Sequence, residues 1–315
     1  MTSLSRPSIR TFVYLAVLFA FLIVVFFLYS FGIVSEGLLG YLLAISLQLS
    51  VPLVLAGLGG MFSERGGVVN IGLEGMLLMG AFAAAAVAYY TRNPWLGVLA
   101  GMGAGAVLAI AHAIICVKFK GNHIVSGTGV ILFGAGFTTL MLQVVWGSKG
   151  YGETITNRIP DIEIEAIRDI PVIGTAFSSI SPIVILMFVI TFLSWYVLFK
   201  TPFGLRLRAA GEDPSTLDTA GVNVEWTRAI GVIISGVLAG LGGAYLSIGF
   251  GSAFGKEMTG GKGFIALAAM IFGNWNPLGV LIAGWFFGFL EGLQYAIAIH
   301  FPVLLPYANF IAMIP

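Results

Sequence analysis

The sequence predicts an all-α membrane protein that crosses the bilayer about ten times. Only 9% of its 315 residues are charged, and 58% are hydrophobic. Soluble domains carry about 25% charged residues, so this composition cannot supply a water-facing surface. The mean hydropathy is +1.01, and apolar stretches of about 20 residues, the length that crosses a bilayer as a helix, recur along the chain.

The composition also excludes several functional classes. A soluble enzyme, a nucleic-acid binder and a disordered chain are all excluded, and the net charge of +1 creates no field that would recruit nucleic acid. Cys116 is the only cysteine, which excludes an internal disulfide and a cysteine-based zinc site. The three histidines are scattered, so we expect no metal site.

Eight apolar stretches are long enough to span the membrane. The first, residues 12–34, follows two arginines as a signal peptide would. It is too long for a signal sequence and lacks a cleavage site, so we interpret it as an uncleaved helix. The others cover residues 37–60, 70–90, 95–117, 124–146, 182–199, 226–250 and 277–299.

Two further apolar segments are shorter. Residues 263–273 reach only about half-way across a bilayer. Another segment begins near Leu304 and stops at Pro315. Either this last segment lies on the surface, or the chain ends just inside a final span; we favour an incomplete last span.

Alternating the spans from a cytoplasmic N-terminus, with Arg65 left out of the count, places eight cations inside and six outside. The inner ones are Arg6, Arg10, Lys118, Lys120, Lys200, Arg206, Arg208 and Arg228, and the outer ones are Arg92, Lys149, Arg158, Arg168, Lys256 and Lys262. Long loops translocate with little regard to charge, so the three cations of the long outer loop can be discounted, which supports the cytoplasmic N-terminus. The chain then forms one membrane domain, residues 1–315, with an outer loop at 147–181 and a cytoplasmic loop at 200–225.

The sequence contains an internal repeat. Leu-Ala-Gly-Leu-Gly-Gly occurs at residues 55–60 and again at 238–243, and each copy is followed by a second Gly-Gly pair, at 66–67 and 260–261. Aligned from these pairs, the two segments share Gly, Gly, Ile, Leu and Met at the same offsets. The copies enter the membrane in opposite senses, and an inverted repeat with broken helices is a common transporter design.

The glycines of the repeat predict broken half-helices. Backbone freed from helical bonding cannot face lipid, so it must line a cavity or be buried in protein. The start of each half-helix offers free N–H groups and a positive dipole end, which suit polar ligand groups. Asn70 and Glu74 are one turn apart, and we expect them to share a helix face beside this region.

Glu74 is the sharpest functional candidate. A carboxylate inside a span costs at least about 2.5 kcal/mol unless it faces water or a partner. It therefore either lines the substrate pathway or has a structural role, accepting hydrogen bonds from the broken backbone or pairing with Arg65. Glu291, the other acid in a span, is better explained as a packing or inter-subunit group. Two glycine stripes, at 97, 101 and 105 and at 284, 288 and 292, indicate close helix packing.

The segment between residues 200 and 225 contains a predicted short helix. Asp213 is a suitable N-cap, Pro214 occupies the first helical position, and Gly221 ends the helix. A surface helix between two spans is typical of a docking element for another protein, although it could also be a simple amphipathic connector.

The chain resembles the integral-membrane permeases of bacterial ABC importers in the ribose/branched-chain amino-acid group, and is most similar to nucleoside-uptake permeases. The resemblance covers most of residues 35–300. It is carried by Ser63-Glu-Arg-Gly-Gly-Val-Val-Asn-Ile-Gly-Leu-Glu-Gly-Met76, by Arg208-Ala-Ala-Gly-Glu-Asp-Pro214, and by Gly261-Lys-Gly-Phe-Ile-Ala-Leu-Ala-Ala-Met-Ile-Phe-Gly-Asn-Trp-Asn-Pro277. The incomplete last span departs from the family pattern.

The resemblance implies a type II ABC importer-like fold and a coupling helix that seats in the ATPase subunit. It also implies a second homologous permease, forming a heterodimer, and an extracytoplasmic substrate-binding lipoprotein in a bacterial cell membrane. The chain itself has no Gly-x-x-x-x-Gly-Lys-Ser/Thr motif, so ATP and Mg²⁺ are expected on the partner subunits and no catalytic residue is expected here.

The predicted function is a permease subunit that forms the pathway for nucleosides. The same machinery carrying ribose-like sugars or branched-chain amino acids is the alternative, and a self-sufficient secondary transporter is a third. The candidate pathway residues are Asn70, Glu74 and Asn274. The candidate ATPase-coupling residues are Glu212, Asp213, Pro214, Ser215, Thr216 and Leu217.

Overall fold

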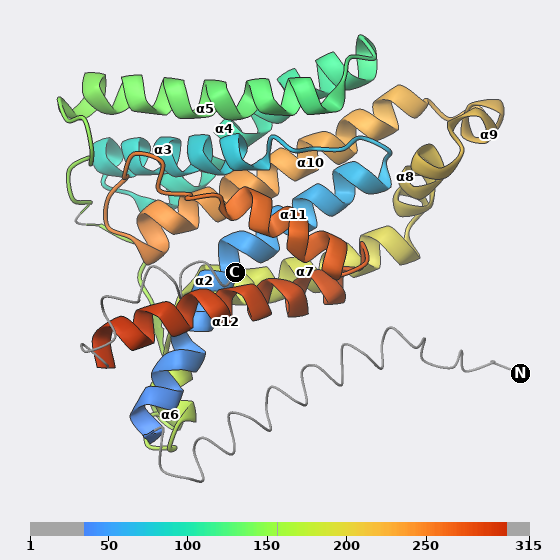
Figure 1. Cartoon of the computed structure of the whole chain (residues 1–315). Helices are drawn as coiled ribbons and strands as arrows, with labels where there is room; N and C mark the ends of the chain where they lie inside the picture. The colour runs from blue at the N-terminus through green and yellow to red at the C-terminus, as the bar shows by residue number, and fades with distance from the viewer. Residues whose placement is uncertain (1–34, 156, 301–315) are drawn as a thin grey trace, which may run out of the picture.

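A computed structural model describes residues 35–155 and 157–300 of the chain (Figure 1). The first predicted span, residues 12–34, and the segment that begins near Leu304 lie outside the described residues. Within the described part the chain is almost entirely helical, with one two-stranded sheet, as the composition predicts.

Seven helices in the described part are long and apolar enough to cross a membrane. Each corresponds to a predicted span. They are α2 (Glu36–Arg65), α3 (Leu73–Thr91), α4 (Pro94–Ala113), α5 (His123–Trp146), α7 (Pro182–Lys200), α10 (Val224–Ala244) and α12 (Pro277–His300). Two of them continue as π-helices, α4 through Ile114–Lys118 and α10 through Tyr245–Phe250. The predicted half-length segment forms α11 (Lys262–Phe272).

Three of the span boundaries are set by asparagine caps. Asn93, Asn122 and Asn223 each precede a helix, and each side-chain oxygen accepts hydrogen bonds from one or two backbone N–H groups of the first turn. An asparagine in this position satisfies donors that the helix cannot pair internally. These caps fix where α4, α5 and α10 begin.

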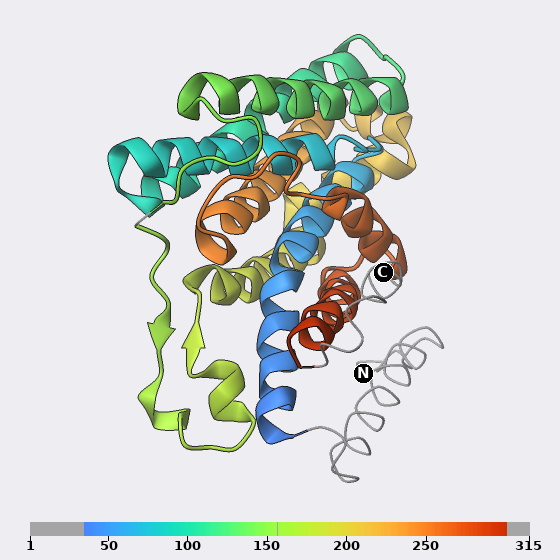
Figure 2. The same cartoon turned by 60° about the vertical axis from the view of Figure 1, so that its left-hand side comes forward.

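Helices α2 and α10, which carry the two copies of the repeated hexapeptide, pack against each other in opposite directions (Figures 1 and 2). A β-carbon added at Gly59 would lie 2.7 Å from the carbonyl oxygen of Ser235. At the other end of the contact, a β-carbon at Gly242 would lie 3.2 Å from the Cα atom of Pro52. The glycines therefore bring the two backbones together at the centre of the molecule.

The surrounding helices repeat the same pattern around this pair. Helices α3 and α4 pack against α10, while α11 and α12 pack against α2. The second glycine of each later Gly-Gly pair also matches in conformation, since Gly67 and Gly261 are both left-handed, with φ of 83° and 86°; the first glycines differ, with φ of −82° at Gly66 and 54° at Gly260. The structure thus confirms the inverted repeat, with α2–α4 related to α10–α12.

The glycine stripes serve this packing. On α4 the stripe faces α10, where a β-carbon at Gly101 would lie 3.2 Å from the carbonyl oxygen of Gly240. On α12 the stripe faces α2, where a β-carbon at Gly288 would lie 2.7 Å from the carbonyl oxygen of Ser46. Each stripe therefore seats one outer helix on the central helix of the opposite repeat, as the sequence predicts.

The predicted outer loop is folded against the membrane helices. It contains a short antiparallel pair, β1 (Ile162–Glu163) with β2 (Ser179–Ile180), a 3-10 turn at Glu165–Ile167, and α6 (Ile173–Phe177). Helix α6 lies on the first turns of α2 (Figure 2). The loop also pairs through its backbone with the segment after α10; the amide of Ile155 donates to Ser252 and that of Gly152 donates to Phe254.

The other long polar segment forms two helices rather than one. The predicted short helix is α9 (Pro214–Thr219), and it is preceded by α8 (Pro202–Glu212), which the sequence analysis did not predict. Thr201 caps α8 and Pro202 begins it, so the same signals that identified α9 were present there too. We call α8 and α9 together the foot.

The glycine stripe on α4 generates a testable prediction. Gly105→Ala should lower the free energy of unfolding by about 1–3 kcal/mol, because the added methyl group overlaps the backbone of Gly236. Gly103→Ala is the matched control on the same helix, where a β-carbon meets open space; it should be neutral or slightly stabilising. Thermal unfolding of the detergent-solubilised protein measures both. Equal melting temperatures would contradict the close contact between α4 and α10.

Candidate functional site

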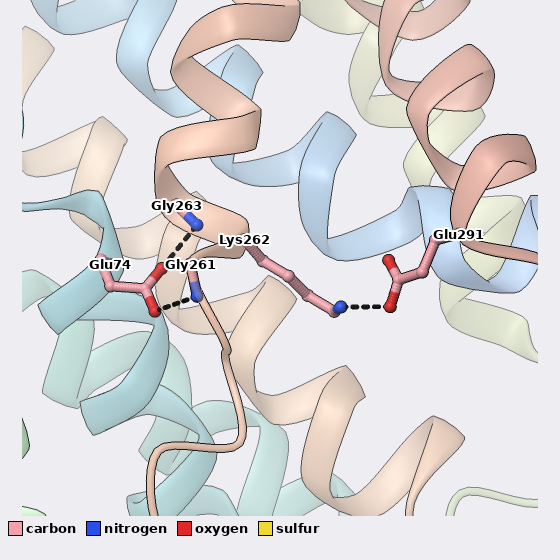
Figure 3. A network of polar contacts seen from close by, with 5 residues as sticks. All are labelled: Glu74, Gly261, Lys262, Gly263 and Glu291. Carbon is pink, nitrogen blue, oxygen red and sulfur yellow. Dashed lines mark hydrogen bonds and ion pairs between the residues drawn. The ribbon is translucent and has the colours of Figure 1, made fainter. Parts of the chain in front are cut away.

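The carboxylate of Glu74 lies at the start of half-helix α11 (Figure 3). Its Oε1 atom accepts hydrogen bonds from the Thr259 hydroxyl at 2.6 Å and from the Gly261 amide at 2.9 Å, and its Oε2 atom accepts one from the Gly263 amide at 2.6 Å. Glu74 belongs to the first turn of α3, so a side chain of the first repeat caps the broken helix of the second.

This arrangement explains how a carboxylate is tolerated in the protein interior. The residue is only 9% exposed, and burying an unpaired charge is costly. Free N–H groups and the positive dipole end of α11 supply the compensation. Of the two structural roles considered for Glu74, acceptance of hydrogen bonds from broken backbone is confirmed. Pairing with Arg65 is wrong, because the Arg65 guanidinium donates to the carbonyl oxygen of Trp275.

A second ion contact holds the same end of α11. The ammonium of Lys262, the first residue of the helix, pairs with the carboxylate of Glu291 on α12 (Figure 3). Both side chains are largely buried, with 13% and 15% of their areas exposed. Lys262, which the sequence analysis counted among the outer cations, is the first residue of α11, and its ammonium forms a pair inside the chain. Glu291 is explained by this contact within the chain.

Asn70 does not share a helix face with Glu74 as predicted. Helix α3 begins only at Leu73, because the preceding residues form a turn. Asn70 is fully buried, and its amide nitrogen donates to the hydroxyl of Ser235 on α10 at 2.6 Å. Its Oδ1 atom has no hydrogen-bond partner among the described residues. Asn70 therefore joins the turn before α3 to the centre of α10, while its Oδ1 atom remains an unused acceptor among the described residues.

A cavity of about 330 Å³ opens beside Glu74. Helix α5 contributes the apolar side chains of Ile131 and Ala135, and α3 contributes Leu78. The opposite wall is polar and comes from the chain before α11, with Glu257, Thr259, Gly260 and Gly261. The site thus combines an apolar side with hydroxyl, carboxylate and backbone groups, a composition typical of small-molecule sites.

Asn274 lies at the opposite end of α11 and is not brought together with Glu74. It follows the helix in an exposed turn, with a left-handed backbone at φ 53°. The neighbouring Trp275 is also left-handed, with φ 51°. Asn274 is therefore separated from the cavity by the length of the half-helix.

The candidate coupling residues lie in the foot. Asp213 caps α9 as predicted, since Oδ1 accepts from the amides of Ser215 and Thr216 and both hydroxyls also donate to the carboxylate. These bonds lower the pKa of Asp213 to about 2. The cap is therefore intact at neutral pH and weakens only as the pH falls towards that value. Gly221 follows α9 with φ 77°, as the predicted end signal requires.

The other coupling residues occupy different environments. Glu212 ends α8, Pro214 begins α9, and Leu217 is the buried residue of α9. The hydroxyl groups of Ser215 and Thr216 are held by Asp213. The foot thus presents a short capped helix, anchored on the protein by one leucine.

Three residues of the site were not singled out from the sequence. Thr259, Lys262 and Ser235 are a hydroxyl next to the second Gly-Gly pair, a cation just after it, and a hydroxyl in the middle of an apolar span. Polar groups at the edge of a helix break are the signal that could have found Thr259 and Lys262. Ser235 carries no such signal, because its role depends on which part of α10 faces Asn70.

Comparison with known proteins places the chain among transport permeases. The family described as branched-chain amino acid transport system / permease component matches residues 42–314. The guanosine ABC transporter permease protein NupQ of Bacillus subtilis is 41% identical over 82% of this chain and 82% of its own length. The nucleoside ABC transporter permease protein NupC of Lactococcus lactis is 41% identical over 78% of each chain.

A third relative carries a different name. The putative glucose ABC transporter permease protein TsgC13 of Haloferax volcanii is 38% identical over 80% of this chain and 76% of its own length. No solved structure matches the chain. The comparisons therefore agree on a transport permease, whereas the cargo named for the relatives is guanosine, nucleosides or glucose.

The cap made by Glu74 can be tested by hydrogen exchange. Glu74→Ala should speed exchange of the amides at residues 259–263 by about tenfold or more, because a lost hydrogen bond to a charged group costs about 1.5–3 kcal/mol. Glu257→Ala is the matched control, since it removes a carboxylate from the same cavity. Mass spectrometry of the exchanged protein resolves this segment. Unchanged exchange in Glu74→Ala would show that the carboxylate does not hold α11.

Proposed function

The chain belongs to the branched-chain amino acid transport system / permease component family, and we propose that it forms the translocation pathway for nucleosides in an ATP-driven importer. One observation carries the choice of cargo. The two relatives at 41% identity, each matched over about four-fifths of the chain, are named as guanosine and nucleoside permeases. At this similarity a shared cargo is the simplest inference.

The cavity beside Glu74 supports this proposal. A nucleoside presents ribose hydroxyl groups and a flat base, so a fitting site needs hydrogen-bond acceptors on one side and apolar walls on another. A carboxylate has about four lone-pair positions, and three of those of Glu74 are used by Thr259, Gly261 and Gly263. The remaining position is our candidate for a ribose hydroxyl, with Leu78 and Ile131 beside the base.

Asn70 and Asn274 have different places in the proposed mechanism. Asn70 is fully buried, so it can meet a substrate only after α10 moves away from the turn before α3. Asn274 is remote from the cavity, so we do not propose that it contacts the substrate. Glu74 remains our principal pathway residue.

We further propose that the chain works with several partners. ATP and Mg²⁺ would bind to separate ATPase subunits that dock on the foot through α9, and an extracytoplasmic lipoprotein would deliver the cargo. A second, different permease chain would complete the pathway. Supporting this pairing, the two organisms that supply the 41% relatives each have another relative of the same stated cargo, at 26% and 24% identity.

The location follows from the same reasoning. The seven apolar helices and the family make this a multi-pass membrane protein. We propose the bacterial cell membrane, with the N-terminus and the foot in the cytoplasm, because the cation count favours that orientation.

A sugar is the second candidate cargo, and the relative named as a glucose permease favours it. A sugar and a ribonucleoside share hydroxyl groups but differ in the base. Competition for uptake therefore separates the two: a nucleoside permease should be inhibited by guanosine or adenosine and not by ribose or glucose.

The composition of the complex and its cargo can be tested together. A tagged form of this chain, purified under mild conditions from its native host, should co-purify with an ATPase and a second permease. Vesicles containing that complex and its lipoprotein should accumulate labelled nucleoside only when ATP is inside the compartment that the foot faces. Uptake by the isolated chain driven by an ion gradient would contradict the proposal and support a secondary transporter.

Two substitutions of Asp213 separate the cap of α9 from its charge. Asp213→Ala should uncouple ATP hydrolysis from uptake, because the first turn of α9 loses its acceptor. Asp213→Asn keeps a good capping residue without the charge and should retain coupling. The measurement is the amount of ATP hydrolysed per nucleoside taken up. Equal ratios in the wild type and Asp213→Ala would remove α9 capping from the mechanism.

A further inference from the structure

The end of α11 that lies away from the cavity has an unusual backbone. Asn274 and Trp275 are consecutive residues with positive φ, and neither is glycine. Non-glycine residues rarely adopt this conformation, and it persists only where surrounding contacts hold it. The contacts around Trp275 therefore hold this end of α11 in position.

The amide of Trp275 donates to the carbonyl oxygen of Met270 in α11, and its side-chain hydrogen-bond partners are the last residues of α2. The indole nitrogen of Trp275 donates to the Glu64 carboxylate at 2.7 Å. The carbonyl oxygen of the same residue accepts from two nitrogens of Arg65, at 3.0 and 3.3 Å. The side chain of Trp275 is thus held by Glu64 and its backbone by Arg65, two neighbouring residues at the end of α2.

The foot packs on the same end of α2. A β-carbon added at Gly211 would lie 3.1 Å from the amide nitrogen of Gly67, and it would overlap the carbonyl oxygen of Arg65. The guanidinium of Arg228 donates to the carbonyl oxygen of Ala210 at 2.8 Å, which ties the end of α8 to α10. Leu207 of α8 is fully buried. The foot therefore cannot shift without moving the backbone that bears Glu64 and Arg65.

The other end of α11 carries the polar wall of the cavity. Glu74 and Glu291 hold this end through Gly261, Gly263 and Lys262 (Figure 3). A helix of 11 residues is a rod of about 16 Å. If Trp275 moves, α11 moves with it as a rigid unit, and so do residues 259–261, which line the cavity.

We propose that Glu64, Arg65 and Trp275 are positioning residues that pass movement of the foot to half-helix α11 and so to the wall of the Glu74 cavity. The inference rests on the proposed function, because it assumes that a partner moves the foot. It adds a physical route between the docking element and the cavity. The route consists of packed backbone and charge-assisted hydrogen bonds, and it does not run through substrate-contacting groups.

The chain contains a matched contact that should not take part. Trp285 on α12 donates its indole N–H to the hydroxyl of Ser46 on α2 at 3.1 Å. This bond also joins a tryptophan to α2, but it lies at Ser46 in the first half of that helix, away from the end that contacts the foot. Trp285→Phe therefore controls for the general cost of losing an indole hydrogen bond.

The test measures movement of the cavity wall in the assembled complex. The full chain carries Cys116→Ala and the probe Ala135→Cys, which faces the cavity from α5, and is reconstituted with its ATPase and partner permease in lipid nanodiscs. The rate at which a small thiol reagent labels the probe is compared with and without ATP and vanadate. Trp275→Phe should reduce the ATP-dependent change in rate by about tenfold, as expected when a bond to a charged group is lost.

Variants of Glu64 distinguish positioning from a merely structural role. Glu64→Gln keeps an acceptor for the indole N–H and should retain most of the ATP-dependent change. Glu64→Ala should lose it, and combining Glu64→Ala with Trp275→Phe should be no worse than either alone. Trp285→Phe should behave as the wild type. Should Trp275→Phe fail to assemble, the Glu64 pair still decides the question.

Several results would overturn the proposal. They are an undiminished change in both Trp275→Phe and Glu64→Ala, an equal loss in Trp285→Phe, or no ATP-dependent change in the wild-type complex. Nucleoside uptake by the same preparations tests the cargo separately. A labelling change without nucleoside uptake would refute the cargo and leave the route standing, whereas nucleoside uptake with full labelling change in both variants would refute the route alone.

Discussion

The need to satisfy broken backbone inside a membrane protein governs this structure. Half-helix α11 begins beside a cavity, and its first N–H groups have no partner within the helix. Glu74, from the opposite repeat, accepts the bonds of Gly261 and Gly263 and of the Thr259 hydroxyl. A charge and a helix end that would each be costly alone stabilise one another. The Glu74 carboxylate is thereby fixed beside the cavity, with one of its lone-pair positions still available to a ligand.

The inverted repeat supplies the frame for that contact. Helices α2 and α10 meet through glycines, and each central helix carries the outer helices of the other repeat. Because the repeats interlock, each broken segment lies against the opposite half. The two breaks are then stabilised differently: Glu74 caps α11, whereas the turn before α3 is tied by Asn70 to Ser235. The site is asymmetric even though the packing is nearly symmetric.

The position of α11 connects the site to the foot. At one end it touches Glu74 and the cavity, and at the other Trp275 is held by Glu64 and Arg65, on which α8 rests. The proposed importer needs a route of this kind, because the energy supplied by a partner ATPase would reach the cavity only through the foot. Short, packed and charge-assisted contacts transmit a movement better than flexible loops do, because the groups that they join move together.

The sequence alone determined the membrane class, the seven spans within the described residues, the repeat and the capped helix at Pro214, because hydrophobic length, glycine pairs and N-cap residues are local signals. It also placed Glu74 beside broken backbone. It misjudged Asn70, since the helix begins three residues later, and it did not find the partner of Lys262, because Glu291 is distant in the sequence. Which donors meet Glu74, and that Trp275 rather than Glu74 meets Arg65, were decided by tertiary structure alone. Those pairings depend on how two separate repeats pack together, and no local pattern encodes the distance between them.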